Sequence, residues 1–409
     1  MKRTVLVFIL LVLILSAGAF ALNWGEALSL AEQNSNELIS AEKDLEASEW
    51  SYRKAWSTFL PQLSASAGLT ETESATSAAW SKSYSYGLSA TQHLFQGMEG
   101  VYGIQSAYAN VEYKRASYRA THASVYYDLR VAFTDLLIAQ ENVKLLEEIL
   151  KQRRENSRLI QLRYDSGRED KGNLMTTLAE EKEAEYQLAA AKHSQQLARL
   201  RISQLLQTEV GGVEEAEALK EAGGADLDSL VRTTPAYVMD RKQLESSELA
   251  YKASISGFLP SLSLSGSYRK TGSDWPPSTE NKSWSLTLSY SFFPGGSNIA
   301  NRVITSAQLD QARQDFDRSV KELRYSLEDA YLGYQDALDA LAVAQVSLAA
   351  SKERSEITQV KYLNGLTNYD EWNRIESAYI QAQKGLLNYK KSALLAEAQW
   401  HKSYGGWVK

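Results

Sequence analysis

The feature that most constrains the fold of this chain is a long heptad pattern that occurs twice. In a proline-free stretch at about 98–163, and again at about 297–362, apolar residues alternate at spacings of four and three. This alternation is the seam of a coiled coil. A helix of roughly 65 residues is on the order of 100 Å long, so we expect an elongated molecule. The seam positions are Val125, Leu129, Ala132, Leu136, Ala139, Val143, Leu146 and Leu150, then Leu323, Leu327, Ala330, Tyr334, Ala337, Leu341, Ala344 and Leu348.

Two shorter motifs indicate that the whole chain consists of two copies of one unit. A Phe-Leu-Pro-x-Leu motif begins at Phe59 and recurs at Phe258, and a basic-Tyr-x-x-Gly motif begins at Arg163 and recurs at Lys361. Each motif recurs after about 200 residues, which is the signature of an internal repeat. We therefore predict repeat 1 at 22–207, an irregular linker at 208–232, repeat 2 at 233–404 and a short tail at 405–409.

Each repeat begins with a helix that ends at Pro61 or Pro260, because proline cannot continue a helix. A strand pair follows, at about 62–96 and about 261–293, where apolar residues alternate with serine, glycine and threonine. A period of two is typical of half-buried strands. Such strands also line soluble sandwiches, but strands of roughly 10 residues with aromatic side chains near their ends favour the lipid-facing wall of a barrel.

Five aromatic side chains suit the girdle that anchors such a barrel at the lipid headgroups. The intrinsic strand preference of aromatic residues would also place them in any sheet. Beyond the first residues no run approaches about 18 apolar positions, so we expect any membrane crossing to be made by strands in a closed barrel. The girdle candidates are Tyr84, Tyr86, Tyr268, Trp284 and Tyr290.

A polar turn at Gly167 or Gly365 ends each long helix. A return helix follows, at about 171–207 in repeat 1 and about 368–404 in repeat 2. The heptad seam becomes polar toward these turns, which we call the tips. The polar seam positions are Ser157, Ser355 and Thr358.

The first residues predict an exported protein. Lys2 and Arg3 precede an apolar run that ends at Leu15, and Ala-Phe-Ala follows, so we predict a signal peptide at 1–21. The apolar run has about 11 residues where a spanning helix needs roughly 20. Because the chain has no cysteine, we expect no disulfide, no thiolate metal site and no lipid anchor behind the leader.

Composition and motifs argue against an enzyme or a nucleic-acid-binding protein. The net charge of −6 supplies no basic field for DNA or RNA. The sequence contains no phosphate-binding loop and no nucleophile-elbow motif. Its histidines show no metal-ligand spacing, so we expect no catalytic residue, no metal and no cofactor. These histidines are His93, His122, His193 and His401.

Four strands per chain are too few for a membrane barrel, since the smallest single-chain barrels use about eight. Two chains would supply about eight strands, but the interior of such a small barrel is filled by side chains. The serine, glycine and threonine residues of these strands are too small to fill it. Three chains, with about twelve strands around an open polar lumen, fit better.

The order helix, Phe-Leu-Pro-x-Leu, strand pair, turn, long helix, Tyr-x-x-Gly tip and return helix, present twice, resembles the TolC-like outer-membrane efflux family, the outer membrane factors. The resemblance covers essentially all of the chain after the leader. It implies an α+β membrane protein, in which a homotrimer forms a twelve-stranded outer-membrane β-barrel continued by an α-helical coiled-coil tunnel across the periplasm.

The resemblance also implies partners: outer-membrane lipid, a periplasmic adaptor and an inner-membrane pump. The trimer would be the exit duct of a tripartite efflux or type I secretion system for small molecules or polypeptides. The alternative from another class is an elongated periplasmic coiled-coil scaffold that conducts nothing.

At the tips, the resemblance assigns residues to roles. Gly365 and Leu366 match the glycine and aliphatic residue of adaptor contact. Gly167 is the equivalent adaptor-contact candidate in repeat 1, although an arginine and no aliphatic residue follows it. Asp370 and Glu371 match the acids of the periplasmic aperture, although acids in a first helical turn also complement the helix dipole. The further aperture candidates are Arg163, Tyr164, Asp170, Tyr362 and Arg374.

We predict that the double substitution Asp370→Asn, Glu371→Gln weakens cation selectivity, because a ring of carboxylates at a channel mouth favours cations. Reversal potentials in planar bilayers under a salt gradient measure this selectivity. An unchanged reversal potential would rule out an acidic aperture at these positions.

Overall fold

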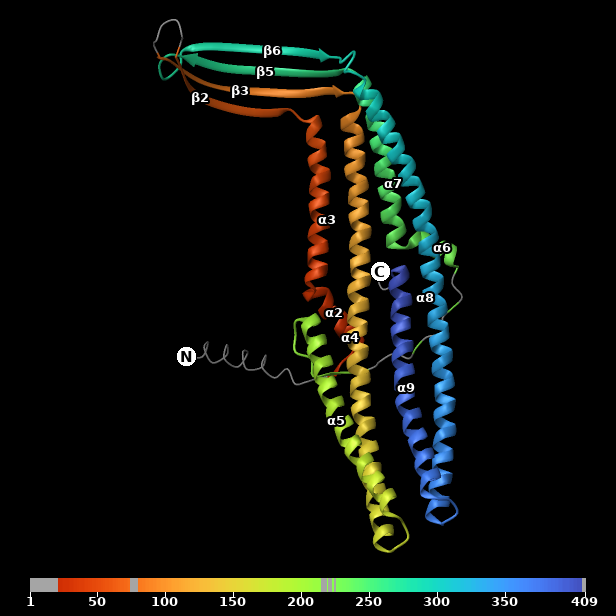
Figure 1. The fold of residues 1–409 in the computed structure, drawn as a ribbon. Coiled ribbons are helices and arrows are strands. Elements are labelled where there is room, and N and C mark those ends of the chain that lie inside the picture. Colours follow the sequence, from red (N-terminus) through yellow and green to blue (C-terminus); the bar gives the residue numbers. More distant parts are fainter. Residues whose placement is uncertain (1–20, 74–79, 215–218, 220–222, 224–225, 407–409) are drawn as a thin grey trace, which may run out of the picture. The chain divides into compact units, whose positions relative to one another are not determined.

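The computed structural model describes residues 21–73, 80–214, 219, 223 and 226–406. Residues 1–20 of the predicted leader lie outside this part, as do residues 407–409 of the predicted tail. Within the described ranges, no helix is both long and apolar enough to cross a membrane. The chain forms two compact units (Figure 1). The helical unit contains Met1–Ser40, Arg119–Thr234 and Arg324–Lys409, and the sheet unit contains Ala41–Tyr118 and Pro235–Leu323.

The sheet unit is built on one antiparallel sheet with the strand order β2-β3-β5-β6. Strands β2 and β3 form the hairpin of repeat 1, and β5 and β6 form that of repeat 2. The hairpins join through β3 and β5, so β2 and β6 are the edges of the sheet (Figure 1). The bounds are β2 Gln62–Glu73, β3 Trp80–Gln96, β5 Ser261–Gly272 and β6 Thr279–Ser289.

The two faces of the sheet differ in polarity, because side chains alternate along each strand and residues paired across strands share a face. We call one the apolar face; its register row Leu63, Ala90, Gly266 and Trp284 is representative. The other, the hydroxyl face, carries mainly serine, threonine and glycine. Serine pairs bridge neighbouring strands there, with Oγ–Oγ distances of 2.7, 2.8 and 2.9 Å. These pairs are Ser64 with Ser89, Ser265 with Ser285 and Ser267 with Ser283.

Strand β6 is shorter than the sequence predicts, since it ends at Ser289 and not near residue 293. Its partner β5 begins at Ser261, which pairs with Ser289, so the residues beyond have no strand to pair with in this chain. Tyr290 therefore lies past the end of the strand, and the alternation that continues through Phe292 does not extend the sheet.

Short helical segments lead into each hairpin. In repeat 1, α3 (Asn36–Ala55) continues as the 3-10 helix η1 (Trp56–Phe59); in repeat 2, α7 (Pro235–Ala253) continues as η2 (Ser254–Phe258). After β3 the chain turns at Gly97, whose φ is +60°. A Cβ at this glycine would lie 2.8 Å from the carbonyl oxygen of Ser256, so the turn requires glycine.

The helical unit is an array of long helices lying side by side in the order α5, α4, α9, α8 (Figure 1). Helices α4 and α8 have 67 residues each and begin in the sheet unit. The short elements α2, β1, β4 and α6 complete the helical unit. The bounds are α2 Trp24–Asn34, α4 Glu99–Asp165, α5 Lys171–Leu206, α6 Leu227–Thr233, α8 Ser297–Leu363, α9 Tyr369–Tyr404, β1 Ala21–Leu22 and β4 Gly212–Val213.

The heptad seam of α4 supplies the core of the helical unit. Leu129 and Leu136, both seam residues, are buried together with Phe133 against Ile202 and Leu206 of α5. Farther along the same seam, Val143 and Leu146 pack with Ile380 of α9, among other residues. The two repeats and the long coiled coils predicted from the sequence are thus confirmed.

We predict that Phe133→Ala destabilises the protein by about 3–5 kcal/mol, because the side chain is 0% exposed and its removal leaves a cavity. The denaturant midpoint of the purified protein measures the change. Leu162→Ala is the control on the same helix, since Leu162 is 60% exposed. Equal effects of the two substitutions would contradict this assignment of the core.

Candidate functional site

Both long helices end in the same hydrogen-bonded turn, which forms the tips. In the first tip the N–H of Gly167 donates to the carbonyl oxygen of Tyr164 at 2.9 Å, and that of Arg168 donates to Arg163 at 2.8 Å. In the second tip Gly365 and Leu366 make the equivalent bonds to Tyr362 and Lys361 at 3.0 and 2.9 Å. Both glycines adopt positive φ, 72° and 73°, as this helix ending favours.

The residue before each return helix caps it. The side chain of Asp170 accepts a hydrogen bond from the backbone N–H of Asn173 at 2.9 Å, and Asn368 accepts one from Glu371 at the same distance. Asp170, predicted to lie at the aperture, therefore has a local role as an N-cap.

Buried aromatic rings join the two tips. Tyr362 and Trp372 stack with their ring centroids 4.6 Å apart and their planes within 2°, and Tyr369 packs edge-on against both. The guanidinium of Arg163, from the first tip, lies 4.6 Å from the centroid of the Tyr362 ring. Ile160 of α4 and Leu174 of α5 belong to the same buried cluster, which therefore spans α4, α5, α8 and α9.

Two tyrosine hydroxyl groups add hydrogen bonds to the first tip and to its return helix. The Tyr362 hydroxyl donates to a carboxylate oxygen of Glu169 at 2.5 Å, and the Tyr369 hydroxyl lies 2.8 Å from Oγ1 of Thr177. Burial raises the pKa of Tyr362 above its usual range, and the hydrogen bond to the Glu169 carboxylate raises it further. The phenol therefore stays a neutral donor in this contact.

A buried polar network next to this cluster was not predicted from the sequence. Arg153 of α4 donates to Glu180 of α5 at 2.7 Å and, across to α9, to Asn373 at 3.2 Å and Ser377 at 3.1 Å. Asn373 in turn donates to Glu180 at 2.8 Å. The Arg153 side chain is 9% exposed, so its charge depends on these partners.

A buried carboxylate continues the network toward α8. Glu376 of α9, 3% exposed, accepts hydrogen bonds from Ser355 of α8 at 3.0 Å and from Asn156 of α4 at 3.4 Å. The sequence signal of this network was the set of polar heptad positions. Ser355 is one of them, and Ser157, which follows Asn156 in the chain, is another. Both serines are buried.

The other predicted tip residues lie apart from this buried cluster. Glu371 forms a double contact with Arg374, at 2.7 Å, and lies 3.8 Å from Arg354. Its hydrogen bond with Arg374 lowers the pKa of the Glu371 carboxyl. Asp370 and Tyr164 are exposed, and Leu366 is 75% exposed at the end of its turn.

The predicted girdle residues occupy different levels of the sheet. Tyr84 and Tyr86 lie near the hairpin loops, where their ring centroids are 6.1 and 5.9 Å from that of Trp275. No sequence pattern singled out Trp275. Tyr268 lies close to this level, where the hydroxyl group donates to Glu280 at 3.4 Å. Trp284 lies farther from the loops, in the register row of Leu63 and Ala90.

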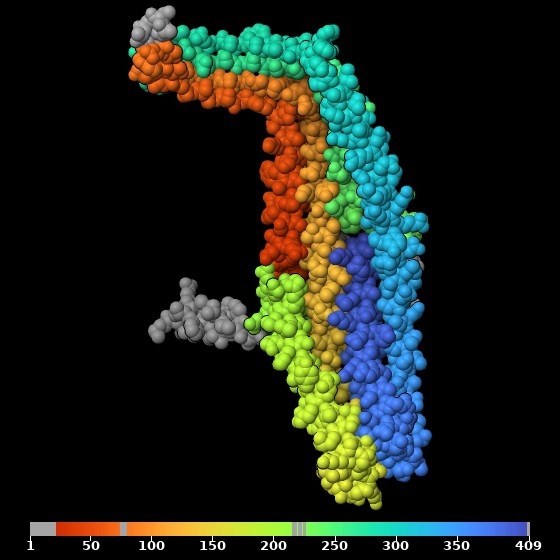
Figure 2. Space-filling view, in the orientation of Figure 1, coloured from red at the N-terminus to blue at the C-terminus, as the bar shows by residue number. Residues whose placement is uncertain are grey.

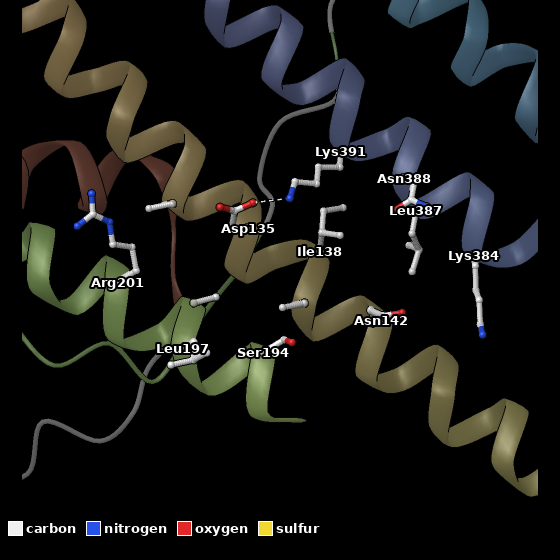
Figure 3. Close-up of a pocket in the computed structure, with 13 residues that line it drawn as sticks. Asp135, Ile138, Asn142, Ser194, Leu197, Arg201, Lys384, Leu387, Asn388 and Lys391 are labelled. Atoms are coloured by element: carbon white, nitrogen blue, oxygen red, sulfur yellow. Dashed lines mark ion pairs between the residues drawn. The ribbon is translucent and has the colours of Figure 1, made fainter. Parts of the chain in front are cut away.

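An open groove of about 560 Å³ lies between α4, α5 and α9 (Figure 3). Asp135 and Lys391 form an ion pair of 2.7 Å across it, and Arg201 and Lys384 are its other charged residues. This lining holds no nucleophile with an adjacent base. Within the described ranges, no group of three or more carboxylate or imidazole side chains is placed to hold a metal ion.

Solved structures with the same fold are outer-membrane proteins. CmeC of Campylobacter jejuni superposes with a TM-score of 0.82 at 18% identity, covering 93% of this chain and 85% of that chain. VceC of Vibrio cholerae gives 0.82 at 16% identity, with 93% and 95% covered, and MtrE of Neisseria gonorrhoeae gives 0.80 at 19%, with 94% and 89% covered. This chain thus shares the fold of these three outer-membrane proteins.

The family model for outer membrane efflux proteins matches residues 27–208 and 234–406, and the chain belongs to this family. It is an efflux channel protein of the outer membrane that extends into the periplasm. No curated protein sequence matches the chain. The predicted family and location are confirmed, as is the fold of long helices with a four-stranded sheet and two repeats in each chain.

We predict that Arg153→Met destabilises the tips by about 1–3 kcal/mol, because it removes the ion pair with the half-buried Glu180 carboxylate and leaves the acceptor groups of Asn373 and Ser377 without this donor. Hydrogen–deuterium exchange of peptides from α4, α5 and α9 near the tips measures the loss of protection. The control is Arg154→Met, since Arg154 is 56% exposed and its ion pair with Glu185 contributes about 0–1 kcal/mol. Similar exchange in both variants would refute a stabilising role for Arg153.

Proposed function

We propose that three copies of this chain form the exit duct of a tripartite efflux or type I secretion system. In this duct, twelve strands enclose a water-filled lumen in the outer membrane, and the long helices continue it as a tunnel in the periplasm. The observation that carries the proposal is a sheet with two opposite faces, one apolar and one hydroxyl, and two unpaired edges.

The edges of the sheet argue for closure by further copies. Within this chain β2 and β6 each pair on one side only, so half of their backbone groups lack a strand partner. Unpaired N–H and C=O groups are too costly in hydrocarbon, where a barrel satisfies them all. Antiparallel pairing of β6 with β2 of the next copy would satisfy both edges. It would also give Tyr290, beyond β6 in one chain, a strand to lie against.

Uncovered apolar residues on the outer helices of the helical unit argue for the same assembly. Helices α5 and α8 form its two sides in the space-filling view (Figure 2). In the single chain each of these helices exposes a stripe of large apolar side chains, several of them at heptad spacing. Packing α8 of one copy against α5 of the next would cover both stripes. The stripes are Leu178, Tyr186, Leu197 and Leu200 on α5, and Tyr325, Leu332, Val343, Val346, Ile357 and Val360 on α8.

The tips support a role as a regulated mouth that docks to an adaptor. Leu366 and its neighbours offer an exposed apolar contact for a periplasmic adaptor, which an inner-membrane pump would complete. The cluster of Tyr362 and Trp372 and the network of Arg153 hold the two tips of one chain together. We propose that they move as one body when the mouth opens to small molecules or polypeptides.

We predict that the purified protein requires detergent, runs as a trimer that dissociates on heating, and conducts ions in planar bilayers. Val346→Asp should reduce the trimer on an unheated gel at least severalfold, because a carboxylate would be buried in the α5–α8 contact. Gln345→Asp is the control, since this exposed residue points away from the apolar stripe.

A soluble monomer would overturn the proposal and favour a non-conducting scaffold. Trimers that stay electrically silent, even after substitutions that disrupt the tip network, would reject the duct as well. Loss of trimers in both position-345 and position-346 variants would show that the α8 stripe is not the subunit contact.

A further inference from the structure

The hydroxyl face of the sheet carries one side chain with a permanent charge among the strand residues that the structure describes. This is Arg269 of β5, which lies between Ser267 and Thr271 on that face. The other ionisable side chain there is His93, near the opposite end of the sheet, where it pairs with Ser263. All the lysines and glutamates of the four strands belong to the apolar face by register.

The neighbours of Arg269 leave its charge open to solvent. Across β3 its register partner is Gly87, and across β6 it is Asn281. A Cβ at Gly87 would lie 2.6 Å from the carbonyl oxygen of Tyr268, so this position excludes a side chain that could cover the arginine. Arg269 is exposed, and none of its register neighbours is an acid.

The basic residues of the apolar face are in a different situation. Lys82 forms an ion pair of 3.0 Å with Glu71, and Lys282 forms one of 2.6 Å with Glu280. Opposite charges in such pairs largely cancel at a distance. The strands carry three lysines and three glutamates on the apolar face, so their net positive charge belongs to the hydroxyl face. The six residues are Lys82, Lys270, Lys282, Glu71, Glu73 and Glu280.

We propose that Arg269 is the charge-selective residue of the outer-membrane part of the duct, favouring anionic over cationic solutes at its level. The inference rests on the proposed trimer, in which the hydroxyl faces line the lumen and three Arg269 side chains form a ring. Charges in an aqueous channel surrounded by protein and lipid of low dielectric constant focus the potential and raise the local concentration of counter-ions. The residues around the ring on this face are small and uncharged, so the arginine ring is the dominant electrostatic feature of the lumen wall.

Cysteine chemistry tests this directly, because the natural chain has no cysteine. Ser267→Cys places one thiol two residues from Arg269 on the same face. Its rates of modification by an anionic sulfonatoethyl and a cationic trimethylammonioethyl methanethiosulfonate are measured in outer-membrane vesicles, with reagents added from outside. The anion-to-cation rate ratio reports the local potential and does not depend on the state of the tips.

Adding Arg269→Gln to Ser267→Cys should lower this ratio by about 3- to 10-fold, as expected for three screened unit charges at roughly 10 Å. Arg269→Lys, which keeps the charge, should preserve the ratio. The matched control is Lys270→Gln, which removes one positive charge from the adjacent residue on the opposite face and should leave the ratio unchanged.

A ratio that does not respond to Arg269→Gln, or responds equally to Lys270→Gln, would overturn the inference. A second variant, Leu286→Cys on the apolar face, tests the proposed duct separately through the modification rate of its thiol. In the duct this thiol faces lipid and reacts slowly, whereas the thiol of the Ser267→Cys variant reacts quickly. Fast reaction at position 286 with slow reaction at position 267 would reject the lumenal placement of the hydroxyl face, and with it both proposals.

Discussion

The satisfaction of backbone hydrogen bonds in an apolar medium is the constraint on which the rest of this structure depends. A sheet of four strands with an apolar face can lie in lipid only if its two edges are paired. The period of two in the strands places the apolar side chains on one face of the sheet. The edge strands β2 and β6 are each unpaired on one side, so further copies of the chain are needed to pair them. The polar lumen of the proposed trimer follows from the same alternation, because every second side chain would point away from lipid.

In the helical unit a different constraint operates. Long coiled coils are stabilised by apolar seams, as the burial of Leu129 and Leu136 shows, but near the tips polar residues replace the apolar ones. Buried polar groups require specific partners, so they favour one arrangement of the helices. The protein is strongly destabilised when that arrangement changes and the partners are lost. In the proposed duct, a mouth that closes in one state and opens in another would be better served by such contacts than by a continuous apolar seam.

Much of the fold could be predicted because it is encoded locally. The heptads of α4 and α8, the glycines of positive φ at the tips and the prolines before β2 and β5 each act through residues a few positions apart. The end of β6 was predicted too far along the chain, because the alternation of apolar and polar residues continues through Phe292. The partner strand β5 begins at Ser261, opposite Ser289, and offers no residue for pairing beyond that point. Strand length is a property of the pair, and the pattern of one strand does not contain it.

The candidate site divides in the same way. By itself the sequence determined the two repeats, the strand faces and the position of the tips, because short-range spacing and backbone sterics decide them. Only the tertiary structure decided that Tyr362 bonds to Glu169 and Arg153 to Ser377, and that Arg269 has no acid beside it. These contacts join residues 193 and 224 positions apart, or depend on strand register, and no local pattern specifies which distant side chain fills a given space.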